Sequence, residues 1–182
     1  MTINSSLSDW CIKLFLLPML ILPGYAAGDE AIASSLQEAN KSLVLRLFNE
    51  GFSGGDITVV EEIFSPDIKL VDPNLPPGIE GIKAIVRKNN ATFEGWSFVI
   101  HDLMAVEDKV IARWTGSGKH IRSFMDESPT NKLVELNGIS IYQIANGRIV
   151  TDWVIPDNLQ FLMQLGILPP LGMTEKSPHA AN

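Results

Sequence analysis

The feature that most constrains the fold is a two-residue turn, Asn146-Gly147, between two long runs of alternating apolar and polar residues. Asn and Gly both tolerate the positive φ angles of a tight hairpin turn, so this pair is the strongest short hairpin signal. A second pair of runs meets in the same way at Glu107-Asp108. The C-terminal half is therefore predicted to form long antiparallel strands, at residues 97–106, 109–120, 133–145 and 148–155.

Helical patterns precede these strands. Apolar residues recur at helical spacing within residues 29–49, and Asp56 is placed to cap a short helix over 57–64. A short strand is predicted at 68–71, a third helix at 80–93 and a last helical turn at 159–165. Helices first and antiparallel strands afterwards indicate an α+β fold in which one sheet buries a face against the helices.

The length of 182 residues fits one domain, which we expect over residues 29–168 with a disordered tail at 169–182. Residues 1–26 resemble a signal peptide, with an apolar run at 14–22 and small residues before a cut after Ala26. The run is too short to span a bilayer, so we expect export to the periplasm or the exterior and no stable membrane span. An uncleaved anchor and a misassigned start codon are the alternatives.

The composition excludes several classes of function. The net charge of −7 and the absence of a Lys/Arg run argue against nucleic acid as a partner. Cys11 is the one cysteine and lies in the segment expected to be removed, which leaves no thiol chemistry. The three histidines show no metal-ligand spacing, so no metal site is expected. Phosphate-loop, dinucleotide and nucleophile-elbow motifs are absent from the sequence.

Tight turns fix the register of strands, and the register fixes which residues share a face. Counting from Asn146-Gly147 places Ser140 opposite Trp153 and Tyr142 opposite Thr151, on one face of the hairpin. The other face then carries Asp152 with a set of β-branched residues: Ile139, Ile141, Val150 and Val154. Because this apolar face needs a cover, we expect a homodimer.

The same count from Glu107-Asp108 places His101 opposite Trp114 and Asp102 opposite Arg113, and alternation puts His120 on the Trp114 face. Polar tips among aromatic rings are typical of a pocket for an apolar small molecule. The alternative is that these side chains are core residues whose polar groups are satisfied internally. The predicted pocket residues are His101, Trp114, His120, Ser140, Tyr142, Thr151 and Trp153.

A set of short motifs occurs in order between residues 36 and 166, each weak alone but fairly specific together. These are Gly55-Asp56, Asp108-Lys109-Val110, Ala112-Arg113-Trp114-Thr115, Gly118-Lys119-His120, Pro129-Thr130-Asn131-Lys132, Gly147-Arg148-Ile149, Trp153 with Asp157, and Gln164-Leu165-Gly166. The set resembles the SnoaL-like polyketide cyclase (ester cyclase) family of the nuclear-transport-factor-2-like superfamily.

This resemblance implies a cone-shaped, curved antiparallel sheet wrapped by N-terminal helices, a deep apolar cavity, frequent dimers and no cofactor. It also implies ring closure by an intramolecular aldol reaction, with a carboxylate as general acid/base and a histidine that holds the substrate. The histidine corresponds to His120. The aspartate falls at about Ser140, which is a departure, because a serine hydroxyl is no general base without activation.

The missing carboxylate leaves the identity of the base open. Asp157, four residues after Trp153, could reach the pocket rim or could cap the last helix. His101 or His120 could serve as the base, because histidine as a residue type titrates near neutrality, and Asp72 is expected near the mouth. Asp152 is set aside, because the predicted register turns it away from the pocket. The sequence thus predicts His120 and Asp157 as catalytic residues. The predicted substrate-binding residues are His101, Trp114, Ser140, Tyr142 and Trp153.

Three functions compete on this basis. One is a cofactor-free cyclase, isomerase or hydrolase that acts on an apolar carbonyl or ester compound. The second is a module that binds an apolar small molecule without chemistry, and the third is a scaffold subunit that uses the Ile/Val face. An ionisable group at the cavity would favour the enzyme, whereas a lining of apolar and hydroxyl groups alone would favour the binding module.

Overall fold

The computed structural model describes residues 24–70 and 75–170. Helix α1 continues directly into a π-helical segment, η1, and three shorter helices follow. The helices are α1 (Gly24–Arg46), η1 (Leu47–Ser53), α2 (Ile57–Ile63), α3 (Ile79–Thr92) and α4 (Asn158–Leu165). The strands are β1 (Phe64–Leu70), β2 (Phe93–Val106), β3 (Lys109–His120), β4 (Leu133–Ala145) and β5 (Arg148–Pro156).

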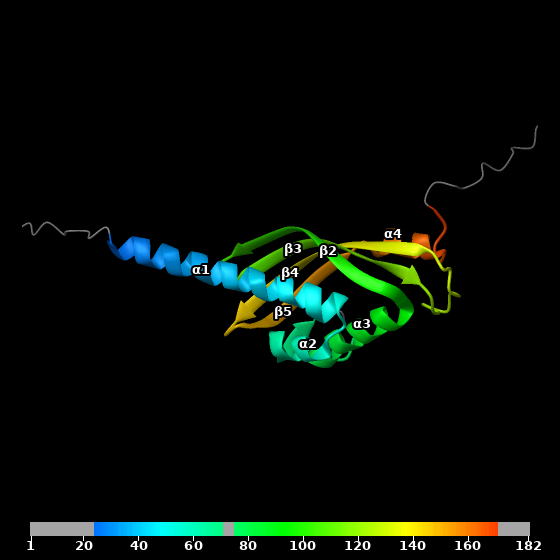
Figure 1. Cartoon of the computed structure of the whole chain (residues 1–182), viewed down its shortest axis with the longest axis horizontal. Coiled ribbons are helices and arrows are strands. Elements are labelled where there is room, and N and C mark those ends of the chain that lie inside the picture. The colour runs from blue at the N-terminus through cyan, green and yellow to red at the C-terminus, as the bar shows by residue number, and fades with distance from the viewer. Residues whose placement is uncertain (1–23, 71–74, 171–182) are drawn as a thin grey trace, which may run out of the picture.

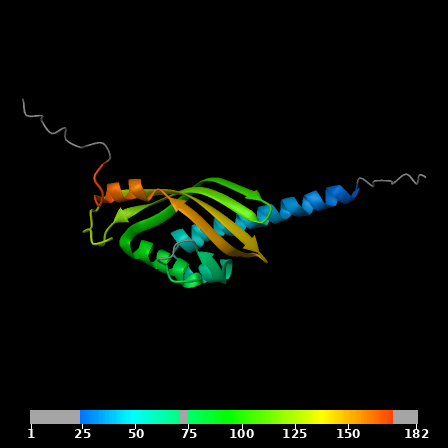
Figure 2. The same cartoon turned by 180° about the vertical axis from the view of Figure 1, so that it is seen from behind.

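The strands form one curved, unclosed sheet in the order β1-β5-β4-β3-β2. Strands β2 to β5 pair antiparallel, and β1 joins the edge by parallel pairing with β5. Helices α2 and α3 lie on one side of the sheet, α1 crosses it, and α4 packs at the far end (Figures 1 and 2). The predicted α+β class and its curved sheet wrapped by helices are confirmed.

Both hairpin turns are formed where the sequence places them. Ala145 pairs with Arg148 and Val106 pairs with Lys109. Asn146 and Gly147 have φ angles of 52° and 71°, the left-handed region that this turn requires. The predicted bounds of β3 and β4 match the observed ones.

The register of the second hairpin changes after two pairs. Ile144 faces Ile149, but Gln143 faces Thr151, so Val150 is an extra residue in β5. Ser140 therefore faces Val154, and Tyr142 faces Asp152. The predicted Ser140–Trp153 pairing is wrong. The one-residue bulge moves every β5 residue beyond it to the opposite face of the sheet from the one predicted.

A similar shift interrupts the first hairpin. The predicted pairing of Asp102 with Arg113 is confirmed, and their side chains form an ion pair with an Nε–Oδ2 distance of 2.5 Å. Beyond it Ile100, rather than His101, faces Trp114. The predicted His101–Trp114 pairing is wrong, because the shift in register falls at His101.

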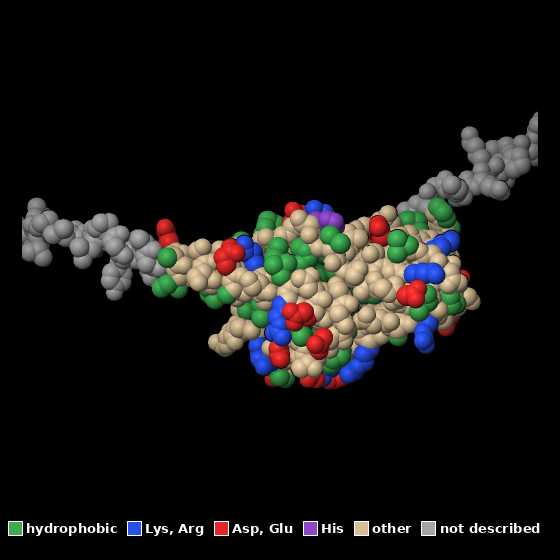
Figure 3. All heavy atoms as spheres, in the orientation of Figure 1, with side chains coloured by type: hydrophobic (Ala, Val, Ile, Leu, Met, Phe, Trp, Pro, Cys, Tyr) green, Lys and Arg blue, Asp and Glu red, His purple; other side chains and the backbone are tan. Residues whose placement is uncertain are grey.

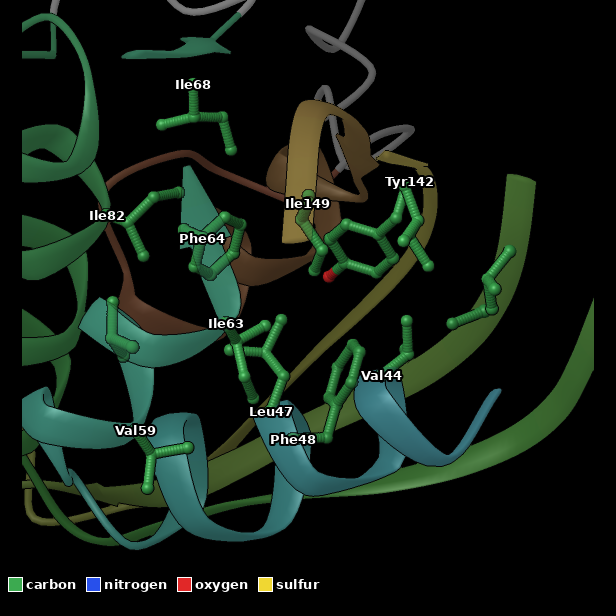
Figure 4. Packing of buried hydrophobic residues seen from close by; sticks show 14 of the residues in the cluster. Val44, Leu47, Phe48, Val59, Ile63, Phe64, Ile68, Ile82, Tyr142 and Ile149 are labelled. Atoms are coloured by element: carbon green, nitrogen blue, oxygen red, sulfur yellow. The ribbon is translucent and has the colours of Figure 1, made fainter. Parts of the chain in front are cut away.

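The core fills the space between the helices and the inner face of the sheet. Phe48 of η1 lies at its centre, with its ring in edge contact with Phe52, Phe98 and Tyr142. Figure 4 shows Leu47 and Phe48 pointing from the helical segment toward Tyr142 and Ile149 of the sheet. Such aromatic pairs each stabilise a core by about 1 kcal/mol beyond the area that they bury.

One serine fixes η1 to the sheet. The Ser53 hydroxyl donates a hydrogen bond to the Phe48 carbonyl over 2.7 Å and accepts one from the backbone N–H of Phe98 over 3.0 Å. These two bonds tie the π-helical turn to β2. As a result the rings of Phe48 and Phe52 face the inner side of the sheet.

The N-terminal part of α1 runs beyond the sheet (Figure 1). Within residues 24–70 and 75–170, no helix combines the length and apolarity needed to cross a bilayer. Most of the predicted signal peptide, all but two residues of the predicted tail, and Asp72 lie outside the described residues.

The cap of α2 offers a test of the local structure. Asp56 accepts hydrogen bonds from the backbone N–H groups of Thr58 (2.8 Å) and Val59 (3.4 Å), as its position in the sequence predicts. We expect Asp56→Ala to lower the free energy of unfolding by about 1 kcal/mol, because two amide donors lose their acceptor. Urea denaturation measures this. Asp56→Asn, which retains a capping oxygen, should lose much less, and an equal loss in both variants would contradict the cap.

Candidate functional site

A cavity of about 260 Å³ lies between the inner face of the sheet and helices η1 and α3. Its wall is mostly aromatic and aliphatic, with four polar side chains: Asn89, Ser140, Asp152 and Asn158. The apolar lining comes from Phe48, Phe52, Leu75, Ile82, Ile85, Val86, Trp96, Phe98, Trp114, Leu136, Val154 and Pro156, and Tyr142 completes it. Apolar walls with a few polar groups are the usual construction of a small-molecule site.

Asp152 is the one charged residue among the described residues that line this cavity. The residue is 8% exposed, and burial raises the pKa of its carboxyl from 3.8 to about 7. Its Oδ1 atom has no hydrogen-bond partner in the described part of the chain. A carboxyl in this state holds or releases a proton near neutral pH, which is what general acid/base chemistry needs.

Three neighbouring groups form a polar wall beside it. The Trp114 indole N–H donates a hydrogen bond to the Ser140 hydroxyl over 3.0 Å, and Tyr142 faces Asp152 across the β4–β5 pair. Burial raises the pKa of the Tyr142 hydroxyl well above its ordinary value, and the Asp152 charge adds to this, while the Ser140 hydroxyl acts in the opposite direction. Tyr142 is therefore a neutral hydroxyl that can donate.

Gly138 determines where the Trp114 ring lies. These residues face each other across β3 and β4, and a Cβ atom at Gly138 would overlap the indole ring. Because the position has no side chain, the ring can lie close to the β4 backbone. This arrangement brings the indole nitrogen to Ser140, two residues further along the same strand.

Seven residues were predicted to be catalytic or substrate-binding. Three of them line this cavity: Trp114, Ser140 and Tyr142. Trp153 is instead on the outer face of the sheet and is 40% exposed, because the bulge at Val150 reverses the expected face. His101 is exposed as well, and its Nε2 atom lies 2.8 Å from the Thr115 hydroxyl. The register prediction is corrected at both positions, and Asp152 takes the inner place that was assigned to Trp153.

The two predicted catalytic residues lie outside the cavity lining. His120 is fully buried, with its ring centroid 5.5 Å from that of Phe93. Its Nδ1 accepts a hydrogen bond from the Thr130 backbone N–H over 3.2 Å, and its Nε2 has no partner among the described residues. Asp157 caps α4, where its carboxylate accepts from the Gln160 backbone N–H over 3.1 Å, the alternative role foreseen for it.

Sequence reasoning missed Asp152 and also the amides Asn89 and Asn158. A bulge leaves no mark in the alternation of apolar and polar residues, so the strand pattern offered no signal for Asp152.

Among residues 24–70 and 75–170, no group of three His, Cys, Asp or Glu side chains is arranged to hold a metal ion. What the cavity does offer is one titratable carboxyl and hydroxyl donors within an apolar chamber.

Comparison with known proteins places the chain in a family. Residues 42–165, well over half of the chain, match the SnoaL-like polyketide cyclase family. The protein belongs to this family, as the ordered motifs predicted. No curated protein sequence matches the chain.

Solved structures share the fold. TsrD from Streptomyces laurentii is 26% identical with a TM-score of 0.68, over 72% of this chain and 98% of that one. IdmH from Streptomyces antibioticus, described as a proposed polyketide cyclase, is 28% identical with a TM-score of 0.61, over 70% and 98%. AclR from Streptomyces galilaeus, described as a proposed hydroxylase, is 22% identical with a TM-score of 0.67, over 74% and 89%, and shows likeness of fold alone.

The buried carboxyl predicts a specific dependence of stability on pH. Between about pH 4 and pH 7 the native state holds a proton on Asp152 that the unfolded chain, with an ordinary pKa of 3.8, has released. The free energy of unfolding should therefore fall as the pH rises through this window. Below and above the window, the contribution of Asp152 should not change with pH. The Asp152 contribution is on the order of 4 kcal/mol.

Urea denaturation of the wild type and of Asp152→Asn at a series of pH values measures this contribution. The neutral amide binds no proton in this range. As the pH rises through the window, the unfolding free energy of the variant should therefore increase relative to that of the wild type. A difference that stays constant with pH would show that the carboxyl is solvated and ordinary.

Proposed function

We propose that the protein is a cofactor-free cyclase or isomerase that acts on a largely apolar carbonyl or ester compound, with Asp152 as its general base. The observation that carries this proposal is the buried Asp152 carboxyl in the wall of an apolar cavity. Its pKa is about 7, and its Oδ1 atom has no hydrogen-bond partner among residues 24–70 and 75–170. Unpaired buried polar atoms are rare in folded proteins, and a ligand group is one way to satisfy them.

The proposed step begins with ionised Asp152, which removes a proton from the carbon next to a carbonyl group. The electron pair of the broken C–H bond forms the C=C bond of an enolate, and the carbonyl π pair moves to its oxygen. The hydroxyls of Ser140 and Tyr142 stabilise this oxygen by donating hydrogen bonds. In a cyclase the enolate carbon then attacks a second carbonyl of the same molecule, whose oxygen takes the proton from Asp152.

The position of Asp152 compensates for the missing carboxylate at Ser140. Asp152 faces Tyr142, two residues from Ser140 on β4, so Asp152 and Ser140 are diagonal neighbours on one face. Diagonal neighbours in an antiparallel pair are about 7 Å apart, within reach of side chains that meet at a shared ligand. The Asp152 carboxylate of β5 can thus reach the same part of the cavity as the aspartate that the family resemblance implies at the position of Ser140 on β4.

A non-catalytic binding module is the second candidate. The predominance of aromatic and aliphatic residues in the wall favours it. AclR, described as a proposed hydroxylase, has the same fold, so the fold does not fix the chemistry. The two candidates differ in whether a bound carbonyl compound exchanges a proton.

Deuterium incorporation next to the carbonyl group of a bicyclic aryl ketone, 2-tetralone, tests the proposal by NMR in D₂O. We expect the wild type to accelerate exchange, with a rate that rises with pH through about 7, because the base must be ionised. Asp152→Asn should lower the enzymatic rate at least about 100-fold.

Asp157→Asn is the matched control, because that carboxylate caps α4 outside the cavity. Its rate should stay within about twofold of the wild type. Binding of the ketone without accelerated exchange would favour the binding module. Loss of exchange in Asp157→Asn, with full activity in Asp152→Asn, would assign the base to Asp157 instead.

We also propose that the outer face of the sheet mediates a homodimer. Five large apolar residues of β2, β4 and β5 are exposed there: Val99, Met104, Ile139, Trp153 and Ile155. Figure 3 shows the side of the molecule on which α1 lies, where apolar side chains also gather above this helix. Exposed apolar patches of this kind often mark protein interfaces.

Sedimentation velocity tests the dimer through Ile139, which is in the central strand β4. The wild type should sediment as a dimer and Ile139→Lys as a monomer, because an unpaired ammonium would have to be buried at the interface. Ile139→Val keeps the apolar surface and should remain dimeric. A wild type that sediments as a monomer would overturn the proposal.

Export remains a proposal that rests on the apolar run at residues 14–22 and the small residues after it. The expected cut after Ala26 falls in the first turn of α1, upstream of every residue that lines the cavity. Processing there would leave the proposed site complete.

A further inference from the structure

A second chamber adjoins the first. It has a volume of about 380 Å³ and is bordered by α3, α4 and the loop between β3 and β4. Six residues line both chambers: Leu75, Ile85, Asn89, Trp96, Leu136 and Asn158. Because the two spaces share this much wall, they lie directly beside each other.

The chambers differ in charge. Asp152 is the one charged residue among the described residues that line the first, and Lys88 is the one among those that line the second. The two carboxamides, Asn89 and Asn158, line both chambers. A ligand that spans them would therefore meet a carboxyl at one end, amide groups along its length and an ammonium group at the other end.

Lys88 is distinct from the other cations of α3. Lys83 binds Glu61 and Glu80, and Arg87 lies 3.9 Å from Glu80. For Lys88, no carboxylate of the described residues lies within ion-pair distance, and its ammonium group lies 4.6 Å from the centroid of the Phe124 ring. Phe124 also lines the second chamber, so the cation–π contact holds the charge at the chamber wall.

We propose that the two chambers bind one elongated, largely apolar carboxylate, with its anionic end at Lys88 and its reacting carbonyl group beside Asp152. This inference rests on the proposed function and adds the shape and charge of its substrate. In a protein of net charge −7, a cation at the second chamber gives a negatively charged ligand a local point of attraction. It also sets the orientation of the ligand, because the opposite orientation would bring its carboxylate to Asp152.

Calorimetric titration with straight-chain carboxylic acids of about 8 to 14 carbons, and with their methyl esters, tests this. We expect the longer acids to bind the wild type about three- to fivefold more tightly than they bind Lys88→Met, as one exposed ion pair would give. The shorter acids, which cannot span both chambers, should bind both proteins more weakly than the longer acids do. The esters should bind both proteins equally.

Lys119→Met is the matched control. It removes the same charge from an exposed position of β3 that lines neither chamber, so it should leave every affinity unchanged. If the long acids bind equally well to wild type and Lys88→Met, the proposal that the ligand has an anionic end at Lys88 is wrong. If the esters still bind in that case, the proposed function is unaffected. Failure of both acids and esters to bind would overturn the elongated ligand, and the exchange of 2-tetralone would then decide the proposed function separately.

Discussion

The site depends on a one-residue bulge in β5. Beyond Val150 the strand shows its other face to the interior, so that Asp152 faces the cavity and Trp153 faces out. Without this extra residue the first chamber would have an indole ring where it now has a carboxyl. The bulge is therefore the feature that converts an apolar cavity into one that can carry charge.

A buried carboxyl is costly to a fold, and the surrounding structure has to hold it in place. Asp152 projects from β5, which pairs with β4 on one side and with β1 on the other, so the backbone around it is fixed on both sides. The aromatic groups of η1 and β3 keep water away, and this exclusion raises its pKa. The same packing that costs stability thus brings the pKa of this carboxyl to about 7, as the proposed proton transfer requires.

Much of the fold could be read from the sequence, because turns and periodicity are local properties. The Asn146-Gly147 turn, the Asp56 cap and the bounds of β3 and β4 all follow from neighbouring residues. The inner face of β4, with Ser140 and Tyr142, was predicted correctly for the same reason. Beyond the bulges the prediction failed, because an extra residue is set by how two strands twist against each other, which depends on distant packing.

Gly138 limits how the first chamber can change. Any side chain at this position would displace the Trp114 ring, and with it the hydrogen bond to Ser140, so this position is confined to glycine. Diversification toward other substrates has to proceed through the opposite wall, where Phe52 and Ile85 lie on helices and can change in size separately. In this architecture the sheet carries the groups proposed to react, and the helices carry the wall positions at which a change in side-chain size would alter the shape of the chamber.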